Sequence, residues 1–304
     1  MANSIALATN FLPILDEIYK RESLTSVLDT ANERIQFINA DTIKLFKTSM
    51  DGLGTYSRNS GYVSGDVTGS WETLQLQYDR GRAFQVDAMD DEETINMAFG
   101  TLLGEFLRTK VVPEIDAIRF AAYAGTSGIS AATPADIGSI SDALVAIDTA
   151  EQTLGDDEVP VEGRIMFVSE AFYSLIKGKV TRYLANETSV QRNVMMLDDM
   201  PIIRVPQGRF NTAIRLLDGS TSGQTGGGYS NVPASGNSYH INFMIVHPSA
   251  VAQVVKHNPA RIITPELNQS ADAYKLLYRV YHGCWVEANK VKGIYLHRGT
   301  TANS

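Results

Sequence analysis

The chain has 304 residues, 44% of them hydrophobic and 20% charged, an ordinary globular composition with enough apolar residues for a sizeable core and one or two domains. Its formal net charge of -8 at pH 7 argues against a broad basic face that would hold nucleic acid. Cys284 is the only cysteine, so the chain has no intrachain disulfide framework. There is no stretch of eighteen apolar residues and no secretory signal pattern, which predicts a soluble chain of cytoplasmic origin without a membrane partner.

Apolar residues recur at helical spacing over Phe11–Thr30, around a charged middle. The pattern fits an N-terminal arm and a helix packed on its own domain equally well. The next helical pattern begins far along the chain, and this separation favours an arm.

The period changes over the next segment. Almost strict alternation at Trp71–Asp87 predicts one long strand, and Ile35–Ser49 is a weaker strand candidate. Met50–Ser70 between them is dense in Gly, Ser, Thr and Asn, so the whole segment predicts a long β-hairpin with a flexible tip. An isolated hairpin is marginal in water, so this one needs another surface, for which a second copy of the chain is a candidate. Arg80 and Arg82 fall in the apolar register and are therefore expected outside a globular core.

The strongest periodic signal lies at Asp91–Tyr123, where apolar residues at spacings of three and four predict one long helix. Asp90 and Glu93 form a variant capping box at its start. At 1.5 Å per residue the helix would span about 50 Å, which is typical of a strut. Pro113 interrupts the pattern, and because the apolar stripe continues beyond it we expect a kink there and not an end.

Two strand-to-helix units follow and predict a compact α+β domain. In the first, Ile165–Val168 is an apolar strand, Ser169 is an N-cap, and a short helix continues through Ile176. In the second, the strand Ile241–Val246 leads to a helix with Pro248 in its first turn.

Other segments complete the predicted domain. The predicted elements are a linker at Gly125–Ala135, a helix over Asp136–Leu154, a short strand at Pro201–Val205 and a Gly/Ser-rich loop at Ser220–Ser238. At the end of the chain, alternation over Tyr274–Ala288 and a return through Ile294–His297 predict a closing hairpin.

No catalytic, cofactor or metal-binding motif is present, and the five histidines lack metal-ligand spacing. The acidic cluster between Asp87 and Glu93 is explained by helix-start electrostatics. Gly223–Ser230 lacks the Lys-Ser/Thr pair that a phosphate loop needs, so it predicts a mobile loop. Cys284 lies in an apolar strand register, which predicts a buried, inert thiol.

The order of elements resembles the major capsid proteins of tailed bacteriophages, which have the Hong Kong 97-type fold. The most specific stretch runs from Tyr78–Thr94 through Gly104–Ala121, which is similar to the extended-loop strand and spine helix of such coat proteins. Ser169–Lys177 and His247–Glu266 are similar to their later segments. The resemblance covers nearly the whole chain and implies an α+β fold with an N-terminal arm, an extended β-hairpin loop, a long spine helix, and peripheral and axial domains.

The resemblance also assigns the parts of the chain. The implied divisions are an N-arm at 1–34, an extended loop at 35–88, a peripheral domain at 89–128 and 253–290, and an axial domain at 129–252 and 291–304. Contacts between subunits are expected at the loop, where the two arginines would pair with carboxylates on a neighbour. The residues for which such contacts are predicted are Tyr56, Arg58, Tyr62, Trp71, Arg80 and Arg82. Pro113 is the predicted spine-helix kink.

The function that the resemblance implies is structural. Copies of the chain would self-assemble into hexamers and pentamers of an icosahedral head, in the virion, after assembly in the host cytoplasm. The head would enclose double-stranded DNA without sequence-specific binding, and scaffolding, portal and decoration proteins are further candidate partners. No enzymatic activity and no cofactor are expected.

Two alternatives remain open from the sequence. The nearer is an encapsulin-like nanocompartment shell protein, which shares the fold but encloses cargo enzymes. The farther is a soluble α/β enzyme without a recognisable motif.

The resemblance also bears on covalent cross-linking. In the type member of the family, a lysine on the extended loop joins an asparagine on an adjacent subunit. Here the tip at Met50–Ser70 contains Arg58 and no lysine, and a guanidinium cannot supply the neutral amine. Lys44 and Lys47 on the ascending strand are the remaining candidates on the loop. We therefore predict a shell that is not cross-linked.

Overall fold

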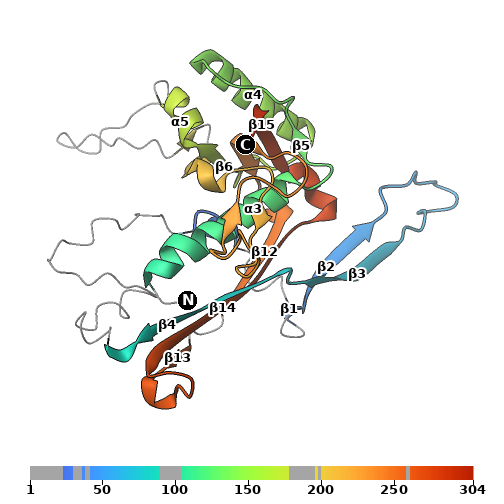
Figure 1. Cartoon of the computed structure of the whole chain (residues 1–304). Coiled ribbons are helices and arrows are strands. Elements are labelled where there is room, and N and C mark those ends of the chain that lie inside the picture. Colours follow the sequence, from blue (N-terminus) through green and yellow to red (C-terminus); the bar gives the residue numbers. More distant parts are fainter. Residues whose placement is uncertain are drawn as a thin grey trace, which may run out of the picture.

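The computed structural model describes residues 23–29, 36–37, 42–89, 104–177, 196–197, 200–257 and 261–303. Within these ranges the chain forms two large sheets that share a long helix, a short two-stranded ladder, and a β-hairpin that extends away from the body (Figure 1). Most of the predicted arm at Phe11–Thr30, and the capping residues Asp90 and Glu93, lie outside the described residues.

The larger sheet has six strands in the order β5-β15-β11-β6-β8-β7. Its strands are β5 (Ser130–Ala131), β15 (Ile294–Ala302), β11 (Tyr239–Val246), β6 (Ile165–Ser169), β8 (Met200–Val205) and β7 (Met196–Leu197). The central strands are continuous apolar runs because both faces of the sheet are covered. Met166 and Phe243 pack with α4 (Ile140–Asp156) and α5 (Glu170–Ile176), whereas the alternate residues Phe167 and Met244 pack in the cluster that contains Phe120 of the long helix.

The smaller sheet is built around β14 (Ala273–Val286), a strand of 14 residues. It pairs antiparallel with β12 (Val251–His257), β13 (Arg261–Ile263) and β4 (Tyr78–Asp87). The β4–β14 ladder joins ten residue pairs, from Ala273↔Asp87 to His282↔Tyr78. This sheet therefore carries the strand that leads out of the hairpin.

The hairpin consists of β2 (Thr42–Met50) and β3 (Val67–Gln75), which pair over nine positions, with β1 (Gln36–Phe37) beside β2. The predicted hairpin is confirmed, but the predicted single strand at Trp71–Asp87 is wrong. The chain leaves the ladder at Leu76 and Gln77, and the following residues enter β4 in the other sheet. Alternation continues across the break because both strands alternate buried and exposed side chains, so the sequence pattern does not reveal the change of partner.

The long helix is continuous over the described residues from 104 to 124, as η3 (Leu107–Val111) and α3 (Val112–Ala124). Five residues, Leu107–Val111, form a π-helical segment immediately before Pro113. Proline supplies no backbone N–H, and π-turns and prolines are the two common causes of irregular helix geometry. The helix thus passes through Pro113 without ending, as predicted.

Several later predictions are also confirmed, and two are wrong. Ser169 caps α5, its Oγ accepting a hydrogen bond from the backbone N–H of Phe172. Pro248 begins only the 3₁₀ turn η5 (Pro248–Ala250), after which the chain forms strand β12 and not a helix. The predicted closing hairpin does not form, because β14 pairs with β4, β12 and β13 while β15 pairs with β11 and β5.

The remaining short elements are η1 (Ser26–Leu28), η4 (Gln207–Arg209), β9 (Arg215–Leu216), β10 (Tyr229–Ser230), η6 (Pro265–Leu267) and η7 (Ala288–Gly293).

Candidate subunit interface

The tip of the hairpin, residues 51–66, carries exposed apolar side chains, and a few hydrogen bonds close its turn and its base. The amide N–H of Ser57 donates to the carbonyl of Gly61, and that of Gly61 donates back, with Gly61 at a φ of 81° that favours glycine. Asp51 accepts a hydrogen bond from the backbone N–H of Asp66 and closes the base of the tip. Leu53 is fully exposed, at 107%, so the tip contributes nothing to a hydrophobic core.

Three of the predicted contact residues lie together at this tip. Tyr56 and Tyr62 contact each other, with ring centroids 4.9 Å apart, and remain 57% and 90% exposed. Arg58 lies in the turn between them and is exposed. Trp71 lies away from the tip, on β3, and is 47% exposed. A row of exposed large apolar side chains on a projecting element is typical of a surface that another protein covers.

Arg80 lies elsewhere, on β4, and has partners within the same chain that the sequence analysis did not identify. Its Nε donates to Oε1 of Glu114 on α3 at 2.6 Å, and its Nη2 donates to the carbonyls of Leu217 and Gly228. Within the subunit the carboxylate partner of Arg80 is therefore on the long helix of the same chain, and its predicted pairing with a carboxylate on a neighbour stays a prediction. Arg80 does lie outside the three apolar clusters of the described residues, as the sequence predicted.

Arg82 binds the glycine-rich segment 217–228. Its Nη2 donates to the carbonyl of Thr225, and a Cβ atom on Gly219 would lie 2.6 Å from its Nη1. The absence of side chains at Gly219 and Gly227 lets the loop backbone approach the guanidinium closely. No carboxylate is recorded beside Arg82 among the described residues, so its predicted pairing with a neighbour stays a prediction.

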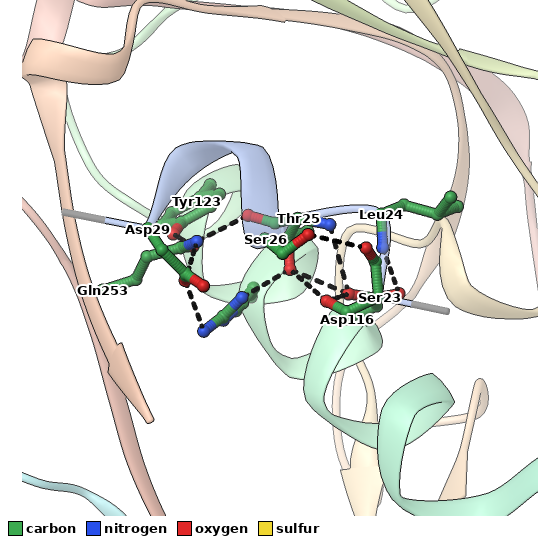
Figure 2. A network of polar contacts seen from close by, with 9 residues as sticks. Ser23, Leu24, Thr25, Ser26, Asp29, Asp116, Tyr123 and Gln253 are labelled. Carbon is green, nitrogen blue, oxygen red and sulfur yellow. Dashed lines mark hydrogen bonds and ion pairs between the residues drawn. The ribbon is translucent and has the colours of Figure 1, made fainter. Parts of the chain in front are cut away.

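A buried polar network joins the N-terminal segment to the body, and sequence reasoning missed it (Figure 2). Asp116 of α3 is 0% exposed. It accepts hydrogen bonds from the hydroxyls of Ser23 and Thr25, from the backbone N–H groups of Leu24 and Thr25, and from Arg209 at 3.0 Å. A buried carboxylate is tolerated only when it is paired and hydrogen-bonded, and this one meets both conditions.

Residues on the other side of the segment complete the network. Arg119 of α3 donates to Thr25 Oγ1 at 2.7 Å and to Asp29 at 3.2 Å. The side chain of Gln253 on β12 donates to the carbonyl of Thr25 and to Asp29, and accepts from the hydroxyl of Tyr123 at 2.6 Å. Burial raises the pKa of Tyr123 well above its ordinary value, so the hydroxyl keeps its proton. The network therefore connects residues 23–29, the long helix and the smaller sheet.

The sequence did contain a signal for part of this network. Asp116 and Arg119 stand between the apolar residues Ile115, Ile118 and Phe120 on the strongest helical pattern of the chain. Charged residues inside an apolar stripe call for partners. The partners could not be named, because Ser23 and Thr25 are 93 and 91 residues away in sequence from Asp116.

The structure bears out the inert environment of Cys284. The thiol is buried, and burial raises its pKa to about 12, so it is protonated and unreactive at neutral pH. Over the residues that the structure describes, no group of three or more His, Cys, Asp or Glu side chains could hold a metal ion. No helix within the described ranges is long and apolar enough to span a membrane.

Comparison with known proteins gives one kind of match. No protein-family model and no curated protein matches the chain. Among solved structures, one from Mycobacterium phage Che8 is similar at 15% identity and a TM-score of 0.59, covering 95% of this chain and 97% of that one. The capsid of cyanophage P-SCSP1u matches at 12% identity and a TM-score of 0.62, covering 98% and 94%. The mature capsid of bacteriophage PhiM1 matches at 11% identity and a TM-score of 0.51, covering 86% and 83%.

These structures share the arrangement over almost the whole chain at an identity that shows the fold alone. The hairpin, the long helix and the two sheets described above are the parts that the sequence resemblance implied. The chain therefore has the α+β Hong Kong 97-type fold of tailed-phage capsid proteins.

Proposed function

We propose that the chain is a major capsid protein, whose copies assemble into hexamers and pentamers of an icosahedral phage head around double-stranded DNA. The main support for the proposal is that the hairpin extends from the body and exposes apolar side chains at its tip. Its nine-pair ladder extends from a chain of capsid fold, and its tip exposes Leu53, Tyr56 and Tyr62. In a lone subunit these side chains would face water, and a neighbouring copy would cover them.

Under the capsid proposal the chain divides into an N-arm, an extended loop, a peripheral domain and an axial domain. Residues 1–34 are the N-arm and 35–88 the extended loop. The peripheral domain is 89–128 with 253–290, which contains the long helix and most of the smaller sheet, and the axial domain is 129–252 with 291–304. The pairing of β4 with β14 means that the last part of the extended loop, Tyr78–Asp87, is also a strand of the peripheral sheet.

The chemistry of the described residues fits a structural role. The one cysteine is buried, and burial raises the pKa of its thiol to about 12. The net charge of -8 suits a wall that confines DNA without gripping it. Scaffolding, portal and decoration proteins are further proposed partners, and the assembled protein would be located in the virion after assembly in the host cytoplasm.

Electron microscopy of the purified protein, with negative stain, tests the proposal directly. We expect closed particles of uniform size, or capsomers that close into particles when concentrated. A small monodisperse oligomer that turns over a substrate would contradict the proposal. Particles that contain cargo enzymes and no DNA after production in the natural host would identify a nanocompartment shell.

The same particles test the absence of covalent cross-links. After boiling in detergent they should give a single band near 33.2 kDa on a denaturing gel. A ladder of subunit multiples that resists reductant would show a cross-link at Lys44, Lys47 or another residue.

A further inference from the structure

The sequence contains two Asp-Gly pairs, Asp51–Gly52 and Asp218–Gly219. Such a pair can rearrange without an enzyme, because glycine has no side chain to keep its backbone nitrogen away from the carboxyl group of the preceding aspartate. Two features of the fold decide whether it does so. The carboxyl group must be free to turn toward the glycine nitrogen, and the backbone at the glycine must be free to move.

The pair Asp218–Gly219 has neither freedom. Oδ1 of Asp218 accepts hydrogen bonds from the backbone N–H groups of Ser220 and Thr221, each at 2.9 Å, and Oδ2 accepts one from the Thr221 hydroxyl. The hydrogen bonds from the hydroxyl and from the two backbone groups lower the pKa of Asp218 well below its ordinary value, so its carboxyl group stays ionised. Gly219 is also enclosed, since a Cβ atom there would lie 2.6 Å from Nη1 of Arg82.

The pair Asp51–Gly52, at the base of the hairpin tip, is exposed and less constrained. Oδ2 of Asp51 accepts a hydrogen bond from the backbone N–H of Asp66 at 2.9 Å, and among the described residues no donor to Oδ1 is recorded. A Cβ atom on Gly52 would meet no atom within 4 Å beyond its chain neighbours. Turning the carboxyl group toward the Gly52 nitrogen therefore breaks one exposed hydrogen bond, whose net contribution to stability in water is small.

We infer that Asp51–Gly52 is a site of spontaneous isoaspartate formation and that the fold protects Asp218–Gly219 from the same reaction. The backbone nitrogen of Gly52 attacks Cγ of the protonated Asp51 carboxyl group, and the new N–Cγ bond closes a succinimide ring. The carboxyl hydroxyl leaves with the amide proton as water. A water molecule then opens the ring: cleavage of the N–Cγ bond restores aspartate, whereas cleavage of the bond from the nitrogen to the main-chain carbonyl carbon of Asp51 gives isoaspartate.

The position of the site gives this rearrangement a structural effect. In isoaspartate the main chain runs through Cβ and Cγ, so it is lengthened directly after Met50, whose pairing with Val67 ends the ladder. Asp51 and Asp66 close the base of the tip through two hydrogen bonds, which would lose their alignment. The exposed apolar side chains of the tip would then be presented differently. The reaction needs only the folded subunit and does not depend on assembly.

Ageing of the purified full-length protein tests the inference. After incubation at neutral pH, isoaspartyl methyltransferase with labelled S-adenosylmethionine marks isoaspartate in the digested protein, and electron-transfer fragmentation locates it. We expect label that increases with time at position 51 and stays at background at position 218. In protein kept unfolded in guanidinium chloride, the two positions should label at similar rates, because the fold no longer distinguishes them.

Substitutions at the two pairs supply the controls. Asp51→Glu should abolish the label at position 51, because the larger ring forms far more slowly, and Gly52→Ala should reduce it, because a side chain hinders the attack. Both residues are exposed, and Gly52 has room for a Cβ atom, so the subunit stays folded. Asp218→Glu is the matched control and should leave the label at position 51 unchanged. Background label at position 51 of the folded protein, or equal label at positions 51 and 218, would overturn the inference.

Discussion

The hairpin and the body of this protein are made from similar residue types but are stabilised in different ways. In the body, aromatic residues such as Phe120 and Phe243 are completely buried, and the charges of Asp116 and Arg119 are held by several partners each. In the hairpin tip, Leu53 and Tyr62 are exposed and Arg58 has no recorded partner among the described residues. A side chain's position in the fold, and not its type, decides whether it stabilises the subunit or is left for a contact outside it.

The largest loss of subunit stability is expected from Asp116→Ala. The substitution would remove the carboxylate that accepts hydrogen bonds from the buried Arg209 and Thr25 and from the half-buried Ser23, which costs about 3 to 5 kcal/mol. Urea unfolding followed by circular dichroism measures the effect. Asp148→Ala on the exposed face of α4 is the control and should change the unfolding free energy by less than about 0.5 kcal/mol. Equal effects would mean that the network does not hold the segment 23–29.

A smaller loss is expected from Arg80→Ala, because its ion pair with Glu114 is partly buried and its other donors reach two carbonyls. The expected cost is about 1 to 3 kcal/mol of unfolding free energy. Arg279→Ala is matched to it on the neighbouring strand β14, and because the pair of Arg279 with Asp79 is more exposed, its loss should lower the unfolding free energy less. If Arg80→Ala leaves the subunit unchanged but abolishes assembly, the intrachain pair is secondary to a contact with a neighbour.

Pro113→Ala should modestly raise the unfolding free energy, whereas the two substitutions above lower it. A proline in a helix interior costs about 3 kcal/mol, but here a π-helical turn precedes Pro113 and the proline ring is itself buried, so we expect a net gain of about 1 kcal/mol. Pro248→Ala is the control, since Pro248 occupies the first turn of η5 where it interrupts nothing. Particle shape and yield should change with Pro113→Ala if the irregular turn sets the curvature of the subunit; unchanged particles would contradict that role.

The smallest effect on subunit stability is expected from removing the hairpin tip. Replacing residues 51–66 by Asn-Gly would connect Met50 and Val67, the last pair of the ladder, through a two-residue turn. Because the tip contributes nothing to the core, the unfolding free energy should change by less than about 0.5 kcal/mol, while particle assembly is lost. Sedimentation velocity measures the assembly, and particles of normal size from the shortened chain would show that the tip is dispensable.

The elements with strong periodicity were predictable from the sequence. Alternation identified β14, the Ser169 cap identified α5, and the helical stripe identified the segment through Val112–Ala124. These signals are local, because each arises from one face of one element meeting the core.

The errors and omissions all concern partners far away in the sequence. The alternation at Trp71–Asp87 could not show that the strand changes sheets at Leu76, and Pro248 could not show that a strand follows its turn. Arg80 was assigned to a neighbour because Glu114 lies 34 residues further on, on an element of different type. The cavity of about 690 Å³ beside β4 and the long helix was not predicted at all, since its lining comes from residues 80–84, 105–115, 217–231 and 278–282 and from Gly208, which lie far apart in the sequence.

The direct passage from β3 into β4 has a mechanical consequence. Tension applied along the hairpin loads β4 lengthwise, and the bonds of an antiparallel ladder lie across that direction. All ten pairs between β4 and β14 are then sheared together instead of opening one after another, and β14 passes the load on to β12 and β13. A shell built of such subunits would transmit outward pressure as in-plane tension from sheet to sheet, so that no single hydrogen bond carries it.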